Sequence, residues 1–152
     1  MKIEIVSFQP KYAQAFYDLN IEWLETHFYV EDYDREVLHK PQQYILDRGG
    51  HIFFALENTT VLGTVALMPH NKDFFELTKM AVTPKARGNT IGQQLMQSCI
   101  DFAKENKFHL MLYSNTKLEN AIYIYRKYGF VEIPVEANSP YKRSNIKMVL
   151  TL

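Results

Sequence analysis

Short runs rich in apolar residues, separated by turns or helical stretches, predict β-strands, and the first of them alternates apolar and polar residues. The first run is Ile3–Phe8, close to the N-terminus. Two further runs, His51–Glu57 and Val61–Met68, flank a turn at Asn58 and predict an antiparallel hairpin. The remaining predicted strands are Phe74–Val82, His109–Ser114, Phe130–Ile133 and Asn145–Leu150.

Helical spacing of apolar residues appears between these strands. It is clearest in Gly92–Asn106, where one stripe contains Leu95, Met96, Cys99, Ile100 and Ala103. A second helix is predicted from Pro10 to about Glu25, and a third at Leu118–Tyr128, where Gly129 suits the end of a helix. Each of these helices is expected to bury one face.

Two shorter helices are predicted between the first helix and the hairpin. Asp34 is expected to cap one of them, and Pro41 suits the first turn of another that runs to about Asp47. Gly49 and Gly50 then break the helical pattern.

The order of the elements predicts a mixed α/β (α+β) fold. The strand Phe74–Val82, the helix Gly92–Asn106 and the strand His109–Ser114 form a strand–helix–strand unit. Such a unit implies a right-handed crossover and one parallel pair in a mostly antiparallel sheet. A length of 152 residues predicts a single domain, 1–152, with a sizeable core.

Composition narrows the classes of function. Formal net charge is zero, and no basic stripe indicates a nucleic-acid partner. The single cysteine excludes an internal disulfide framework and fits a cytoplasmic location. No apolar stretch is long enough for export or for a membrane span. The five histidines show no metal-ligand spacing, so no metal is expected.

The turn between Val82 and the helix at Gly92 carries the strongest chemical signal. It contains Arg87 and Gly88, and it opens directly into an amphipathic helix. The first N–H groups of a helix have no intrahelical partner, so they suit phosphate oxygens. Arg87 adds a cation, and the glycines let the main chain approach an anion closely.

This turn resembles the pyrophosphate loop of the GNAT superfamily of N-acetyltransferases, whose pattern is Arg/Gln-x-x-Gly-x-Gly/Ala. Arg87 and Gly92 match the pattern, whereas Thr90 stands where the first glycine usually lies. A second segment, Leu118–Phe130, is similar to the GNAT pattern Asn-x-x-Ala-x-x-Leu-Tyr-x-x-x-Gly-Phe, with Ala121 and Tyr125 in register. The resemblance implies a GNAT-like sheet with its parallel pair at the acyl-CoA site.

The resemblance also implies where acetyl-CoA would bind as co-substrate. The end of the strand at Met80, Ala81 and Val82 would pair with the pantetheine arm through its main chain. The pyrophosphate would lie on the turn, which comprises Arg87, Gly88, Asn89, Thr90, Ile91, Gly92 and Gln93. The family's pantetheine asparagine is replaced by Leu118, and either Asn115 or Asn120 could substitute or act as a cap or turn residue.

Two side chains are candidates for acid–base chemistry. Tyr125 matches the family tyrosine near the CoA sulfur, where it would protonate the leaving thiolate; alternatively, it only packs its helix on the sheet. Glu76 lies at the spacing of some family general bases, and strict alternation would place it on the same face as Val82. Partial burial would raise its pKa. The alternatives are a solvated glutamate, one paired with Lys79, or water acting as the base.

The resemblance implies that the acceptor enters between the first two helices and the last hairpin. Candidate substrate-binding residues there are Trp23, Tyr29, Tyr141 and Arg143. Aromatic walls with Lys142 and Arg143 would suit a small amine that carries a carboxylate, although a solvated basic turn explains the same residues.

The leading interpretation is an acetyl-CoA-dependent N-acetyltransferase that acts on a primary amine of a small molecule or peptide by direct transfer. A non-catalytic acyl-CoA-binding sensor or scaffold is the alternative, and transfer of a longer acyl group is a third. No nucleic-acid or membrane partner is expected, and a homodimer is left open.

Overall fold

The computed structural model describes residues 2–88 and 90–152 of the chain. Within these residues, seven strands form one sheet in the order β1-β2-β3-β4-β5-β7-β6. Their bounds are β1 (Glu4–Ser7), β2 (His51–Glu57), β3 (Thr60–Pro69), β4 (Phe74–Val82), β5 (His109–Ser114), β6 (Val131–Ile133) and β7 (Ile146–Leu150). The pattern of apolar runs therefore predicted every strand of the described chain, and it gave β2, β4 and β5 with their observed bounds.

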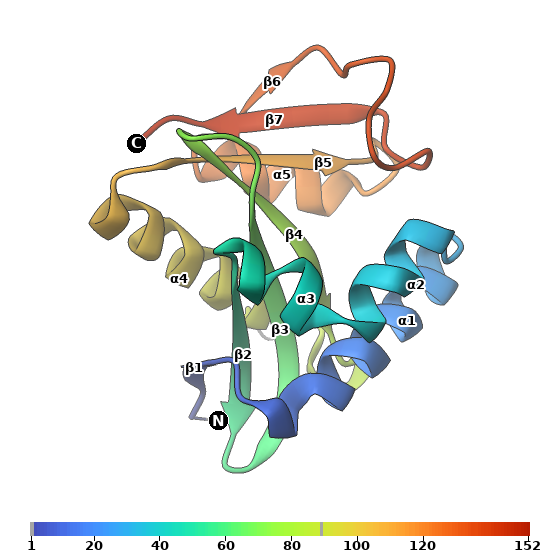
Figure 1. Ribbon diagram of the computed structural model, residues 1–152, viewed down its shortest axis with the longest axis vertical. Helices are drawn as coiled ribbons and strands as arrows, with labels where there is room; N and C mark the ends of the chain where they lie inside the picture. The colour runs from blue at the N-terminus through green and yellow to red at the C-terminus, as the bar shows by residue number, and fades with distance from the viewer. Residues whose placement is uncertain (1, 89) are drawn as a thin grey trace.

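Helices cover both faces of the sheet (Figure 1). The α-helices are α1 (Ala13–His27), α2 (Asp32–His39), α3 (Pro41–Tyr44), α4 (Ile91–Asn106) and α5 (Glu119–Lys127). Short 3₁₀ turns occur at Pro10–Tyr12, Leu46–Arg48 and Pro84–Ala86. The helix predicted from Pro41 to Asp47 is thus a short α-helix followed by a 3₁₀ turn. It ends at Gly49, whose φ of 90° is left-handed.

The first turn of α2 differs from the prediction. Asp34 was expected to cap this helix, but the N-cap residue is Glu31. Asp34 is the third residue of the helix, and its carboxylate accepts a hydrogen bond from the Glu31 backbone N–H at 3.1 Å. This reciprocal arrangement is a capping box, and it fixes the direction of the Asp34 side chain toward the sheet.

The pairing of β4 with β5 confirms the predicted parallel pair. The two strands pair only from Phe74 to Glu76, against His109 to Met111. The other neighbouring strands of the sheet are antiparallel. Because the β4–β5 ladder stops at Glu76, the rest of β4 is free of β5 and borders an opening in the sheet.

A bulge in β4 overturns one expectation. The register with β3 shifts between Ala81 and Thr78, and Lys79 between them has a left-handed φ of 56°. The extra residue changes the phase of the alternation. Val82 therefore packs with the α4-side core, whereas Glu76 pairs with Met68, which belongs to the α1-side core. The two side chains lie on opposite faces, so the expectation of a shared face was wrong.

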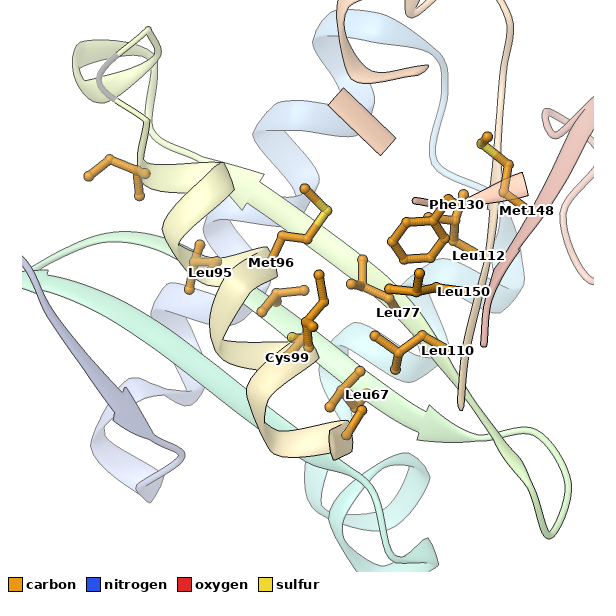
Figure 2. Close-up of a cluster of buried hydrophobic side chains, with 14 of the residues drawn as sticks. Leu67, Leu77, Leu95, Met96, Cys99, Leu110, Leu112, Phe130, Met148 and Leu150 are labelled. Carbon is orange, nitrogen blue, oxygen red and sulfur yellow. The ribbon is translucent and has the colours of Figure 1, made fainter. Parts of the chain in front are cut away.

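Two apolar cores lie on the two faces. The core beneath α4 includes the predicted stripe and residues of β3, β4, β5 and β7, and Figure 2 shows its members Leu67, Leu77, Leu95, Met96, Cys99, Leu110, Leu112, Phe130, Met148 and Leu150. The core beneath α1 and α2 contains Phe16, Leu24, Val37, Leu38, Ile45, Ile52, Phe54, Leu56, Ala66 and Met68. Together they hold the bulged end of β4 between α1 and α4.

Candidate functional site

A cavity of about 570 Å³ lies where β4 and β5 diverge. Its walls come from α1, the end of β4, the start of α4, β5, α5 and the segment before β7. It therefore joins the helix-start turn at Arg87 to the acceptor side at Trp23 and Tyr141. A cavity of this size suits an extended ligand that reaches both sides of the sheet.

The turn before α4 leaves space for an anion to approach its backbone closely. Gly88 has a φ of 89°, and a Cβ added there would meet nothing within 4 Å. A Cβ on Gly92 would make only ordinary contacts, 3.6 Å from Met80 Sδ and 4.0 Å from Val82 Cγ2. Both positions thus leave space beside the first turn of α4, whose N–H groups and dipole favour negative charge. These residues fit a pyrophosphate.

Arg87 is held next to this turn by two contacts. Its Nε donates to the Val82 carbonyl at 3.0 Å, and its Nη2 pairs with Glu22 Oε1 of α1 at 2.5 Å. The guanidinium thus bridges the end of β4 and α1 at the edge of the cavity. An arriving pyrophosphate would compete with Glu22 for this cation.

Most of the predicted co-substrate residues line this cavity. They are Met80, Ala81, Val82, Arg87, Gly88, Thr90, Ile91, Gly92, Gln93, Asn115 and Asn120. The predicted residue Asn89 lies outside the described residues. The amide of Asn115 holds a local turn, because its Nδ2 donates to the Arg143 carbonyl at 2.7 Å and its Oδ1 accepts from the Lys117 N–H at 2.9 Å. Asn120 is exposed on the first turn of α5.

Tyr125 also lines the cavity. Its ring packs against Phe130, with centroids 5.9 Å apart, and against the α4-side core. Burial raises the pKa of its phenol to about 12, so the hydroxyl stays protonated at neutral pH. Tyr125 therefore packs its helix on the sheet and also lines the cavity, and its role as the acid stays a prediction.

Glu76 is buried on the α1 side of β4 and has a polar partner. Its Oε2 accepts a hydrogen bond from the Tyr141 hydroxyl at 3.1 Å. Burial raises the pKa of Glu76, while Lys79 and the hydrogen bond from Tyr141 act in the opposite direction. Glu76 is not among the described residues that line the cavity. Its partner Tyr141 does line the cavity.

Sequence reasoning missed the buried charges around Glu76. Lys79, turned toward α2 by the bulge, donates from Nζ to the Tyr141 hydroxyl at 3.1 Å and to Asp34 Oδ1 at 3.3 Å. Arg143 contacts both carboxylate oxygens of Asp34, at 2.5 and 3.0 Å, and pairs with Glu31 at 2.9 Å. The available signal was a lysine within a mainly apolar strand, because a buried lysine is rare without a partner.

The predicted substrate residues divide into two groups. Trp23, Tyr141 and Arg143 line the cavity. Tyr29 is 54% exposed and is not among the described residues of its wall. The guanidinium of Arg143 is already paired with two carboxylates, so it is a weak candidate for binding a substrate carboxylate.

The sequence from residue 13 to residue 130 matches the family model described as acetyltransferase (GNAT) family. The chain belongs to the GNAT acetyltransferase family. No curated protein matches the sequence significantly. The family assignment confirms the resemblance that the Arg87 turn and the Tyr125 segment indicated.

Solved structures of the GNAT family share the fold over nearly the whole length of both chains. A GNAT acetyltransferase from Staphylococcus aureus Mu50 is 22% identical, with a TM-score of 0.86 over 97% of this chain and 98% of its own. An acetyltransferase from Streptococcus agalactiae is 24% identical, with a TM-score of 0.84 over 99% and 98%. A GNAT acetyltransferase from Elizabethkingia anophelis, solved with acetyl-CoA bound, is 23% identical, with a TM-score of 0.72 over 99% and 98%.

Among residues 2–88 and 90–152, His, Cys, Asp and Glu nowhere gather in a group of three that could hold a metal ion. No helix in the same part of the chain combines the length and apolarity that a membrane crossing requires.

Proposed function

We propose that this GNAT-family protein is an acetyl-CoA-dependent N-acetyltransferase that transfers the acetyl group directly to a primary amine. The observation that carries the proposal is the continuity of the cavity. It has the anion-binding turn and Tyr125 in its α4-side wall, and Tyr141 with its buried partner Glu76 on the α1 side. One ligand can therefore extend from the anion-binding turn past Tyr125 toward Tyr141.

Acetyl-CoA is the co-substrate in this proposal. The pyrophosphate would lie on Arg87 and the N–H groups of the first turn of α4. The pantetheine arm would follow the end of β4 at Met80–Val82, where β5 no longer pairs with the strand. The acetyl-CoA complex of the Elizabethkingia acetyltransferase supports this assignment through the shared fold.

The chemistry requires three proton-handling or charge-stabilising roles. The amine must lose a proton, the carbonyl oxygen must be stabilised, and the leaving thiolate must gain a proton. Glu76 is the base in this proposal, and Tyr125 is the acid. The raised pKa of Tyr125 keeps its proton available at neutral pH.

The acceptor is a primary amine of a small molecule or peptide that enters beside Trp23. The charges of Lys79 and Arg143 are matched by Asp34 and Glu31. Because these cations already have buried or half-buried carboxylate partners, the proposal does not depend on an acceptor carboxylate.

We also assign residues 1–152 to one catalytic domain. The single buried thiol, Cys99, fits the reducing cytoplasm.

A non-catalytic acyl-CoA sensor is the second candidate. One observation favours it, because Glu76 does not reach the cavity wall in the described structure. A sensor would bind acetyl-CoA as the cavity suggests but would release no thiol when amines are added.

The deciding experiment incubates the pure protein with acetyl-CoA and a panel of amines and follows free thiol. We expect thiol release that depends on the amine, and Glu76→Gln should lower turnover by about 100- to 10,000-fold with nearly unchanged acetyl-CoA affinity. The loss should be greatest below the pH optimum, where the amine is mostly protonated. Tight acetyl-CoA binding without turnover on any amine would instead support the sensor.

A further inference from the structure

Tyr141 occupies the position between the cavity and Glu76. It lines the cavity, although only 3% of its surface is exposed, and its hydroxyl donates to Glu76 at 3.1 Å. Glu76 is absent from the described lining of the cavity. Of this hydrogen-bonded pair, Tyr141 is therefore the residue that an amine in the cavity can contact.

The Tyr141 hydroxyl oxygen also contacts two residues of β4 at its bulge. Lys79 donates to it at 3.1 Å, and Thr78 Oγ1 lies 3.3 Å from it. Lys79 reaches this point because its left-handed backbone directs two successive side chains of β4 to one face. Left-handed backbone is unfavourable for a lysine, so the surrounding contacts must hold it in place.

Further contacts hold the Lys79 ammonium group in place. Its ammonium contacts Asp34 at 3.3 Å and lies 4.5 Å from the centre of the Tyr141 ring. Asp34 is in turn held by Arg143 and by the capping box of α2. The ammonium therefore has a fixed position beside the phenolic oxygen, where it would stabilise negative charge that develops there.

We propose that Tyr141 relays the proton from the acceptor ammonium to Glu76, and that Lys79 positions and polarises the Tyr141 hydroxyl. In the relay, the substrate N–H proton passes to Tyr141 Oη while the Tyr141 proton passes to Glu76 Oε2. The products are a neutral amine, an intact tyrosine and a protonated glutamate, so protons and charge balance. The inference rests on the proposed function, because it needs an amine acceptor.

The electrostatic surroundings support a concerted relay. Burial and the nearby Glu76 raise the pKa of Tyr141 well above its usual value, so a free tyrosinate is disfavoured. Both protons must then move together. The titratable or charged groups that act on Tyr141 or Glu76 come from α2, β4, β5 and the segments beside them, namely Tyr33, Lys79, Tyr113, Arg143 and His70. Asp34 acts on Lys79 and Tyr33.

The test compares the wild type with Tyr141→Phe, Lys79→Met and the control Tyr33→Phe in single-turnover reactions. Tyr141→Phe keeps the ring and should lower the transfer rate about 100-fold or more, with unchanged acetyl-CoA affinity. Lys79→Met should lower it about tenfold or more. Tyr33 packs its ring 5.9 Å from that of Tyr141 and is absent from the described cavity wall, so Tyr33→Phe should stay near the wild-type rate.

Two further readouts separate a relay from a structural role. The wild-type rate should depend on the fraction of D₂O along a curve, because two protons move in one step, whereas the residual rate of Tyr141→Phe should depend on it linearly. The acid limb that Glu76 gives to the pH profile should also disappear in Tyr141→Phe. A loss of rate caused only by loosened packing would change neither the curvature nor the limb.

The outcomes are distinguishable. If the wild type transfers acetyl groups and folded Tyr141→Phe is equally fast, the relay is wrong and the proposed function stands. If Tyr141→Phe does not fold, a linear D₂O dependence in the wild type or an unaffected Lys79→Met overturns the relay. A wild type that transfers to no amine refutes the proposed function itself, and the relay fails with it.

Discussion

The two faces of the sheet differ in what they bury. The face beneath α4 is covered by an apolar core, and its one thiol, Cys99, is a core residue whose pKa is raised by burial. The face beneath α1 and α2 carries the buried charged residues of the described chain, Asp34, Glu76 and Lys79. Apolar burial stabilises a fold regardless of pH, whereas buried charges lose their hydration and must be compensated by partners. The cavity lies where the two environments meet.

Asp34 shows how the polar face is compensated. Burial alone would raise the pKa of its carboxyl, but the hydrogen bond from Arg143 and the charge of Lys79 outweigh burial and lower it. The carboxylate is thus stabilised in its charged form. The difference between the faces therefore predicts that one responds to pH and the other does not.

The largest expected effects on stability compare one residue from each face. Asp34→Asn would leave Lys79 and Arg143 without their shared carboxylate and should lower the free energy of unfolding by about 3–5 kcal/mol. Leu95→Ala would open a cavity beneath α4 and should lower it by about 2–5 kcal/mol. Denaturant unfolding at pH 7 measures both.

The pH dependence of these two variants should then separate the faces. A depressed folded-state pKa gives stability that is present above the unfolded pKa of about 3.9 and is lost as pH falls through the folded value. Asp34→Asn should therefore converge with the wild type in acid, whereas Leu95→Ala should keep a constant deficit. A constant deficit for Asp34→Asn would show that its charge contributes nothing to stability.

The apolar face was largely predictable from sequence. The stripe on α4 and the apolar runs of β2, β4 and β5 are local patterns, so a short window of sequence contains them. The turn at Arg87 was predictable for the same reason, because its glycines and the following helix are contiguous.

The polar face was not predictable in the same way. The bonds from Lys79 to Asp34 and Tyr141 join positions that are 45 and 62 residues apart. They also depend on one left-handed residue, which no alternation rule contains. Strict alternation therefore placed Glu76 on the wrong face relative to Val82, and Asp34 was interpreted as a cap rather than as a buried partner.

Tyr125 tests whether the apolar face contributes to the chemistry. Tyr125→Phe removes only the hydroxyl and should lower turnover by about 100-fold, with similar acetyl-CoA affinity, if this group protonates the leaving thiolate. The deficit should shrink for an acyl donor with a more acidic thiol. Rates with both donors measure this.

Two variants control for packing at Tyr125. Tyr128 packs against the same core but is not among the described residues of the cavity wall, so Tyr128→Phe should be nearly silent. Tyr125→Ala should destabilise the fold by less than the ~3–5 kcal/mol of a fully buried aromatic, because it removes a partly buried ring. A fully active Tyr125→Phe enzyme would leave the residue a packing role only.

Gly92 tests the space at the start of α4. A Cβ there would meet only ordinary contacts with Met80 and Val82, so we expect the Gly92→Val protein to fold. The added side chain would occupy the space beside the first turn of α4. It should weaken acetyl-CoA binding by about 5- to 150-fold, equivalent to ~1–3 kcal/mol of steric cost. Calorimetric titration measures the affinity, with Gly92→Ala as the smaller control. Unchanged affinity in a folded Gly92→Val protein would move the pyrophosphate elsewhere.

The smallest expected effect concerns Thr90, where the family usually has glycine. Thr90 has a left-handed φ of 63°, which explains why glycine suits this position. Thr90→Gly would lose the contact from Gln94 Nε2 to the hydroxyl at 3.3 Å but would relieve the backbone. The free energy of unfolding should rise by about 0.5–1 kcal/mol, since relief of ~1–2 kcal/mol exceeds the added entropy of the unfolded chain.

Thr90→Ala separates the backbone from the hydroxyl, because alanine keeps the unfavourable φ and removes the oxygen. Acetyl-CoA affinity should be unchanged or tighter in Thr90→Gly and nearly unchanged in Thr90→Ala, if the hydroxyl is not a phosphate ligand. A large loss of affinity in both variants would show that the threonine oxygen binds the pyrophosphate. The departure from the family pattern would then be a functional substitution, and the chemistry of the α4 turn would depend on a side chain as well as on its backbone.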